Sequence, residues 1–351
     1  MATKNWNAGI IRPVAVAPTG PFQDGAAPGV WTLDQVAYWL QQGLWPIAGN
    51  APRALIAGGY TSTGRTNVIN TVVITTVGNA TDFGDLLSET GGLAGFSSNT
   101  RGVFAGGTTG TVTNVIQYVT IASAGNATDF GDLLITDLGP FGYSNSTRGV
   151  ISGGADAGST NSNVIQYVTI ATTGNATDFG DLTQARTGTG GGCSSSTRGL
   201  VGGGLQYGTG ANYNIIDYTT IASSGNAIDF GDLTSRGSSE QDTCGSVASD
   251  TRAVWGGGYG SATSSNVMDY VTIATTGNAT DFGDLTVGRQ NPAGAASSLR
   301  GLFCAGYATN YSNIIDYITI ASVGNATDFG DLTYTATQAA ACSSATAAVQ
   351  P

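Results

Sequence analysis

The residues best suited to chemistry are paired carboxylates, which recur along the chain in the phrase Asp-Phe-Gly-Asp. Its six copies supply 12 of the 23 acidic residues, as Asp82/Asp85, Asp129/Asp132, Asp178/Asp181, Asp229/Asp232, Asp281/Asp284 and Asp328/Asp331. Carboxylate oxygens suit Ca²⁺, and a pair of carboxyl groups is also what glycoside hydrolysis requires. No pair is set apart by its surroundings, and each belongs to a different copy of a repeated unit. We therefore interpret them as turn-capping residues beside a glycine bulge, and we expect no metal and no cofactor.

Other catalytic groups are scarce in these 351 residues. His is absent, which excludes a Ser-His triad and a His-ligated metal. The cysteines are scattered, without a C-x-x-C pair, and are expected to be small core side chains: Cys193, Cys244, Cys304 and Cys342. A net charge of −11 argues against a nucleic-acid partner, and no apolar run is long enough for membrane insertion. We expect a protein that is not an enzyme.

Internal repetition predicts the architecture. The phrase Gly-Asn-Ala-Thr-Asp-Phe-Gly-Asp-Leu occurs six times, once with Ile228 in place of Thr. Each copy follows a segment such as Asn163–Ala171, which contains Tyr in every repeat except the first, where Thr71 replaces it. That segment in turn follows an Arg-Gly segment ending in Gly-Gly, such as Arg148–Gly154, with looser versions at Arg53, Arg252 and Arg300. Successive arginines from Arg53 to Arg300 lie 48, 47, 50, 54 and 48 residues apart. A period near 50 built from short β-rich segments is typical of propeller blades.

These segments predict an all-β fold, with a six-bladed β-propeller over residues 53–351. A Ser-rich stretch before each Arg, such as Cys193–Thr197, completes four strands per blade. We expect the small-residue Gly-Gly strand at the innermost position, where backbones approach closely. The first blade lacks a Ser-rich strand of its own, and Cys342–Thr346 resembles Cys193–Thr197. We therefore expect the C-terminus to supply that strand and close the ring, which removes two sheet edges.

The order of motifs within a blade resembles the kelch repeat: a hydrophobic strand ending in Gly-Gly, then a Tyr, then an aromatic residue at Phe83 and its equivalents. The chain departs from that pattern in having Phe where kelch repeats usually have Trp, and in lacking the kelch His. Kelch-type oxidases need His to bind copper, so the resemblance implies the fold without that activity.

Turns after the first and third strands are nearly constant between repeats, whereas those after the second and fourth strands vary. Alternate turns of a meander lie on opposite faces, so we name these the constant face and the variable face. Tyr, Ser, Gly and Asn dominate the variable face, as in adaptable recognition surfaces. Loop sequences also vary where the loops have no function, because loops tolerate change. The candidate receptor-binding residues are Tyr207, Tyr213, Tyr259, Tyr307 and Tyr311.

Residues 1–52 differ in composition and are predicted to form an anchoring arm with a short helix over residues 33–42. They contain four of the five tryptophans, and the candidate anchoring residues are Trp31, Trp39 and Trp45. These aromatic side chains either pack beneath the propeller or dock on another chain. The run from Pro28 to Pro46 resembles a short module of tail-fibre and appendage proteins of tailed phages, especially marine ones.

This resemblance implies a virion protein, assembled in the host cytoplasm. The function it implies is that of a tail-fibre or appendage protein, which takes part in host adsorption through variable propeller loops. Its expected partners are other virion proteins, a host cell-surface glycan or protein, and further copies of this chain, a trimer being one option. Two alternatives stay open: a capsid-decorating or purely structural virion protein, and, less favoured, a glycan-active propeller enzyme.

Overall fold

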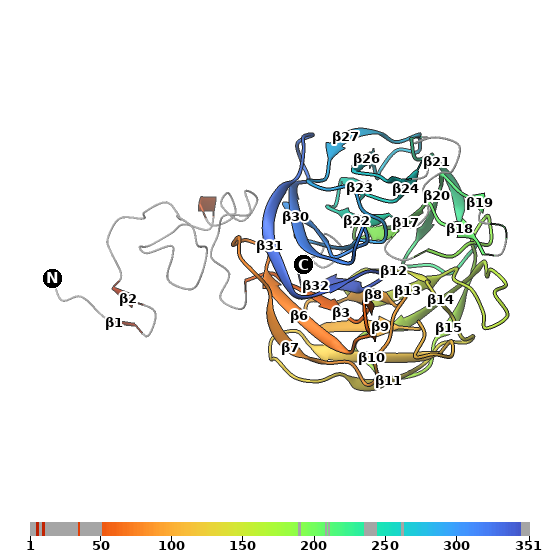
Figure 1. Cartoon of the computed structure of the whole chain (residues 1–351), viewed down its shortest axis with the longest axis horizontal. Coiled ribbons are helices and arrows are strands. Elements are labelled where there is room, and N and C mark those ends of the chain that lie inside the picture. Colours follow the sequence, from red (N-terminus) through yellow and green to blue (C-terminus); the bar gives the residue numbers. More distant parts are fainter. Residues whose placement is uncertain are drawn as a thin grey trace.

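Six four-stranded antiparallel sheets stand around a common centre as the blades of a propeller (Figure 1). The computed structural model describes residues 5–6, 9–10, 34–35, 51–188, 191–207, 209, 211–234, 244–260 and 263–344. Within each blade the strands follow one another as a meander, and the expected six-bladed β-propeller is confirmed.

Strand bounds repeat closely from blade to blade, and the four strands of a blade run in order from its inner to its outer edge. Blade 1 is β32 (Ala340–Ser343), β3 (Arg53–Ala57), β6 (Val68–Val73) and β7 (Thr81–Asp85). Blade 2 is β8 (Ala94–Ser97), β9 (Arg101–Ala105), β10 (Val115–Thr120) and β11 (Thr128–Asp132). Blade 3 is β12 (Phe141–Ser144), β13 (Arg148–Ser152), β14 (Val164–Thr169) and β15 (Thr177–Asp181).

The second half of the ring follows the same plan. Blade 4 is β16 (Gly192–Ser194), β17 (Arg198–Gly202), β20 (Ile215–Thr220) and β21 (Ile228–Asp232). Blade 5 is β22 (Gly245–Ala248), β23 (Arg252–Gly256), β26 (Val267–Thr272) and β27 (Thr280–Asp284). Blade 6 is β28 (Ala293–Ala296), β29 (Arg300–Cys304), β30 (Ser312–Thr319) and β31 (Thr327–Ala336).

The innermost position belongs to the Ser-rich strands, so the prediction that the Gly-Gly strand lies innermost was wrong. The strands β8, β12, β16, β22, β28 and β32 contact one another around the centre, and the Gly-Gly strand is second in each blade. Close approach of backbones occurs at the inner strands as well as at the Gly-Gly segment. A Cβ on Gly142 would lie 2.7 Å from the carbonyl oxygen of Gly95 in the neighbouring blade, so a side chain there would push the inner strands apart.

Serines at the ends of the inner strands tie neighbouring blades together at the centre. Ser144 Oγ donates to the carbonyl oxygen of Ser97 (2.8 Å) and accepts a bond from the Ser97 N–H (3.2 Å). The same pattern links Ser97 to Ser343 and Ser194 to Ser144. We call Ser97, Ser144, Ser194 and Ser343 the serine chain. Blades 5 and 6 have Ala248 and Ala296 at this position, so the chain is interrupted there.

The most strictly repeated phrase joins the blades at their outer edges. Phe83 and Gly84 form a β-bulge on β7, and the following blade bonds to this edge. The N–H of Gly125 donates to the carbonyl oxygen of Phe83 (2.8 Å), and Asn126 Oδ1 accepts from the N–H of Asp85 (3.1 Å). Gly84 has φ +151°, and a Cβ there would collide with the backbone of Gly125. The Gly-Asn-Ala turn and the Asp-Phe-Gly-Asp bulge are therefore two halves of one contact between blades.

A second repeated contact uses the arginine that opens the second strand in blades 2 to 6. The guanidinium of Arg101 lies 4.5 Å from the ring centroid of Tyr118, which meets Phe130 edge-on at 5.8 Å. Arg101 Nη1 also donates to the carbonyl oxygen of Ile170 in the next blade (2.9 Å). Equivalent bonds from Arg148, Arg198, Arg252 and Arg300 repeat this link. The Arg, Tyr and Phe of the repeat thus serve packing within and between blades.

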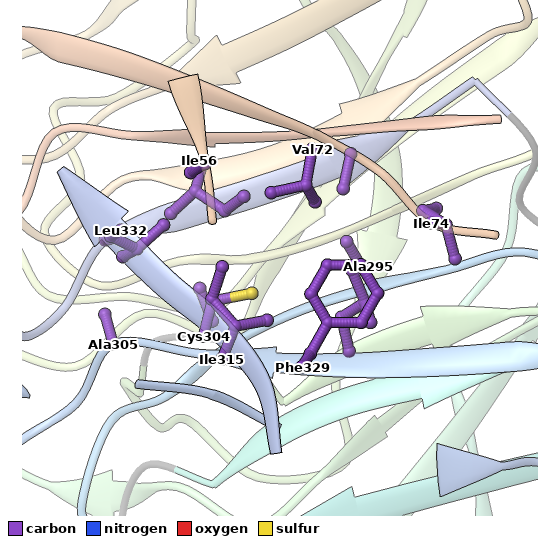
Figure 2. Packing of buried hydrophobic residues seen from close by; sticks show 14 of the residues in the cluster. Ile56, Val72, Ile74, Ala295, Cys304, Ala305, Ile315, Phe329 and Leu332 are labelled. Carbon is purple, nitrogen blue, oxygen red and sulfur yellow. The ribbon is translucent and has the colours of Figure 1, made fainter. Parts of the chain in front are cut away.

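The ring closes through the C-terminal strand, which pairs with β3 from Ala54↔Ser343 to Ala57↔Ala340. Figure 2 shows the closing interface, where Ile56 and Val72 of blade 1 face Phe329 and Leu332 of blade 6 in one buried cluster. The first blade therefore draws its inner strand from the other end of the chain.

Little of the N-terminal segment falls within the described residues. β1 (Asn5–Trp6) pairs with β2 (Gly9–Ile10), and Asp34 and Gln35 are helical. The rest of the helix predicted over residues 33–42 lies outside the described residues, as do the candidate anchoring residues Trp31, Trp39 and Trp45.

Candidate functional site

The loops of the variable face are built on short pairings between segments of the chain. Three of the loops after the second strand are small hairpins: β4 (Tyr60–Thr61) with β5 (Gly64–Arg65), β18 (Leu205–Gln206) with β19 (Ala211–Asn212), and β24 (Tyr259–Gly260) with β25 (Thr263–Ser264). We call the segment between the last strand of one blade and the first strand of the next a link. Links also pair with the loop after the second strand of the blade that they enter, as at Thr187↔Leu205 and Gln290↔Tyr307. The face therefore presents side chains from an anchored backbone.

Tyr207 and Tyr213 share the hairpin of blade 4. Tyr207 is 43% exposed, and its N–H donates to Asn161 Oδ1 (2.9 Å), while Asn161 Nδ2 donates to the carbonyl oxygen of Leu205 (2.7 Å). The Tyr213 hydroxyl lies between two amides: it donates to Gln206 Oε1 (3.3 Å) and accepts from Gln184 Nε2 (3.4 Å). Because Asn161 belongs to the loop of blade 3, these bonds join the loops of blades 3 and 4 beside the exposed Tyr207.

Tyr307 and Tyr311 stand together on blade 6, with ring centroids 5.4 Å apart and an interplanar angle of 80°. The loop of blade 5 reaches this pair, since Ser264 Oγ donates to the carbonyl oxygen of Tyr307 (3.2 Å). Tyr259 begins the hairpin that carries Ser264 and is half-buried. Within the described parts of the chain, no hydrogen bond or ring contact connects this group to Tyr207 and Tyr213.

The sequence-based choice of tyrosines missed Tyr60. It directly follows Gly-Gly in blade 1, as Tyr259 does in blade 5, and Tyr307 occupies the same position in blade 6. These three blades are consecutive in the closed ring, so their tyrosines form an arc. The ring of Tyr60 lies over Gly91 of the next link, and the Arg65 guanidinium is 5.1 Å from its centroid. Aligning the residue after Gly-Gly in each repeat would have identified it.

Two buried ion pairs support the links beneath the face. Arg186 Nη1 lies 2.9 Å from Asp217 Oδ2 and Arg289 Nη1 lies 2.8 Å from Asp316 Oδ2, with all four side chains at most 1% exposed. Thr183 Oγ1 donates to the same carboxylate, Asp217 (2.6 Å). Burial lowers the pKa of the Arg186 guanidinium, and the charge of Asp217 opposes that shift. These buried side chains hold the links and loops in place and are not accessible as acids or bases.

Blades 2 and 3 have hydrogen bonds to a glutamine side chain in place of this ion pair. Gln117 and Gln166 occupy the position of Asp217 and accept bonds from the N–H groups of Leu87 and Leu134 (2.7 Å each). In the link before blade 3, Asp137 stands where Arg186 stands in the next link, and it is buried with Oδ1 unbonded. Burial first, and then the charge of Asp156, raise the pKa of Asp137 well above its ordinary value.

The centre of the ring holds a cavity of about 60 Å³, lined by the inner strands. A cavity needs roughly 10–15 Å³ to hold one water molecule, so this space is large enough for water. Its lining includes Ser97, Ser144, Ser194 and Cys193, and burial raises the pKa of that thiol. This volume is far below the roughly 300–1,000 Å³ of a typical small-molecule site.

The paired carboxylates lie on the outermost strand of each blade, one pair per blade, as their repetition predicts. In the described portion of the chain, no group of three His, Cys, Asp or Glu side chains is placed to hold a metal ion. No helix in that portion combines the length and apolar character needed to cross a bilayer.

No family model and no curated protein sequence matches the chain.

Proposed function

We propose that this chain is a structural protein of a tailed-phage virion, whose propeller binds the host cell surface through its variable face. One observation carries the proposal: the residues that repeat are used in contacts within and between blades, and the residues that vary gather on one face. The Arg-Tyr-Phe stack and the Gly-Asn turn illustrate the repeated class. Binding residues are found disproportionately on loops that a rigid scaffold positions.

The chemistry of the variable face favours an uncharged, hydroxyl-rich target such as a glycan. Tyrosine rings give sugar rings a flat apolar surface, and neighbouring amides supply hydrogen-bond donors and acceptors. Tyr207 with Asn161 and Gln206 is one such combination, and Tyr307 with Tyr311 and Gln290 is another. We propose Tyr207, Tyr213, Tyr259, Tyr307 and Tyr311 as the receptor-binding residues.

The proposal includes a kelch-like character for the blades, supported by Gly-Gly after the second strand, Tyr on the third and Phe on the fourth. It also includes the N-terminal segment as the attachment to other virion proteins or further copies of the chain. The resemblance of residues 28–46 to modules of phage appendage proteins supports that assignment. The protein would act in the virion without catalysing a reaction.

The test is binding of the purified chain to host cells and to a glycan array. Two variants separate the groups: Tyr207→Ala/Tyr213→Ala, and Tyr259→Ala/Tyr307→Ala/Tyr311→Ala. We expect at least one of them to lose roughly tenfold or more in affinity, since stacked aromatic groups carry much of such interfaces. Thr173→Ala/Thr276→Ala on the constant face is the matched control and should bind normally.

Normal binding by both tyrosine variants, with their melting unchanged, would rule out the variable face as the binding surface. Immunogold labelling of intact particles tests the location. Labelled tail tips agree with adsorption, whereas labelled heads would replace this proposal with a capsid-decorating role.

A further inference from the structure

Arg65 is a positively charged residue on the variable face, at a position where the other blades have neutral side chains. It pairs with Tyr60 in the hairpin of blade 1. The residues that take its place in blades 2 to 6 are Val112, Asn161, Asn212, Ser264 and Tyr311. In blades 3 and 5 this side chain bonds to the loop of the next blade, since Asn161 Nδ2 donates to the carbonyl oxygen of Leu205 (2.7 Å) and Ser264 Oγ to that of Tyr307 (3.2 Å). Arg65 makes no such bond within the described residues, so a structural role in joining the blades does not account for its charge.

The guanidinium of Arg65 has donors available to a ligand. In the described part of the chain it makes neither a hydrogen bond nor an ion pair, and Glu89, exposed in the link before blade 2, is not paired with it. Of its nitrogen atoms only Nε is buried, so both Nη groups reach solvent. The two arginines beneath the same face differ in this respect, because Arg186 and Arg289 are each buried in an ion pair with an aspartate.

Tyr60 holds this guanidinium in place. The guanidinium carbon of Arg65 lies over the Tyr60 ring, 5.1 Å from its centroid, an arrangement that leaves the in-plane N–H groups free to donate. The ring itself packs on Gly91, where a Cβ would come within 2.5 Å of a ring carbon. The other described links have larger residues at the position of Gly91, namely Leu138, Thr187, Gln290 and Thr337. Glycine in this one link therefore makes room for the Tyr60–Arg65 pair.

The surroundings of Arg65 add hydroxyl groups. Its Nη1 lies 4.0 Å from the point where a Cβ of Gly110 would be, so the guanidinium reaches from the hairpin of blade 1 to the loop of blade 2. Thr109 and Thr111 flank Gly110 in that loop, and both are exposed. Charge-assisted bonds from a guanidinium to a carboxylate or phosphate are stronger than bonds between neutral groups, and hydroxyls can donate to the same oxygens. The composition of this place suits an oxyanion.

We propose that Arg65, with Thr109 and Thr111 beside it, binds an acidic group of the host glycan, either a carboxylate or a phosphate. We call these three residues the anion subsite. The inference rests on the proposed function and extends it: the tyrosine groups take the uncharged part of the glycan, and Arg65 takes an acidic substituent. Arginine serves this purpose better than lysine, because its planar fork donates two parallel bonds to two oxygens of one anion.

The first test uses soluble sugars and needs no knowledge of the receptor. Calorimetric titration of the full chain with glucuronate, glucose 6-phosphate and glucose compares a carboxylate, a phosphate and a neutral form of one sugar. We expect at least one acidic sugar to bind roughly tenfold more tightly than glucose, and Arg65→Gln to abolish that preference. Arg53→Gln is the matched control, since Arg53 is also half-buried but opens β3 on the constant face, and it should keep the preference. Acidic sugars that bind no better than glucose would overturn the proposal.

The second test uses host cells and separates the two sources of the acidic group. Amidation of surface carboxylates, or removal of surface phosphates with hydrofluoric acid, should lower binding of the wild-type chain roughly tenfold and leave binding of Arg65→Gln unchanged. If the tyrosine variants lose binding while Arg65→Gln binds as tightly as the wild type, the proposed function stands and the anion subsite is refuted. If the wild-type chain does not bind cells, the proposed function fails, whereas a preference for an acidic sugar that depends on Arg65 still supports the subsite.

Discussion

The serine chain at the centre of the ring gives a prediction whose size follows from the structure. Ser144→Ala removes a donor to the carbonyl oxygen of Ser97 (2.8 Å) and an acceptor for its N–H (3.2 Å), both in a buried setting. A buried group left without its partner costs about 1–3 kcal/mol. Water in the adjoining central cavity of about 60 Å³ can replace part of this bonding. We therefore expect the free energy of unfolding to fall by about 1–3 kcal/mol.

The same reasoning predicts a gain where the chain is interrupted. Ala248→Ser adds a hydroxyl next to Ser194, the residue that the preceding blade presents at this position. If the new hydroxyl makes the bonds that Ser144 makes, stability should rise by about 1 kcal/mol, the usual net value of a hydrogen bond.

Both values can be measured by urea denaturation followed by circular dichroism. Ser146→Ala is the control, because Ser146 is exposed in the adjoining turn of the same blade. It should change stability by less than about 0.5 kcal/mol. A Ser144→Ala variant as stable as this control would show that the central hydroxyls do not hold the blades together.

Four further outcomes follow from the described contacts. Burial raises the pKa of Asp137, so ionising this carboxyl destabilises the folded state once the pH rises above the ordinary Asp pKa of about 4. Asp137→Asn should therefore raise the melting temperature at about pH 7 but not at about pH 3.5. An equal effect at both pH values would contradict the raised pKa. Arg186→Leu leaves Asp217 buried without its cation and should lower the free energy of unfolding by about 3–5 kcal/mol, measured by urea denaturation. Deleting residues 340–351 removes β32 and exposes the edge of β3, and light scattering should detect aggregation; a monomer with unchanged melting would contradict closure by β32. Adding EDTA should leave the melting temperature within about 2 °C, and a larger drop would indicate a structural metal ion.

The repeated residues allowed the fold to be predicted, because each copy of a phrase performs the same contact in its own blade. The pairing of β32 with β3 could be expected from the likeness of Cys342–Thr346 to Cys193–Thr197. Strand order toward the centre could not, since glycine is required wherever backbones approach, and both Gly95 and the Gly-Gly segment meet that condition. Sequence composition alone does not separate these two kinds of crowding.

The sequence predicted which face carries the candidate residues, but it did not predict which of those residues lie together. Alternation of turns places all the variable loops on one face, yet only the structure pairs Tyr307 with Tyr311 and fixes Tyr207 to Asn161. The ion pairs beneath the loops do have a signal in the sequence: Asp217 and Asp316 on the third strand each belong to a blade whose preceding link carries an arginine, Arg186 and Arg289 respectively. Long-range coupling of this kind becomes visible only when the repeats are aligned with their links.

The position of β3 in the closing blade has a mechanical consequence. Residues before Ala51 lead directly into β3, which is hydrogen-bonded to β32 on one side and to β6 on the other. A pull through this segment would run along the strand, so the bonds on both sides would resist together in shear instead of separating one after another. The terminal strand that completes the ring at rest would thus also share the tensile load, and a propeller tethered at its N-terminus would withstand drag best with its ring closed.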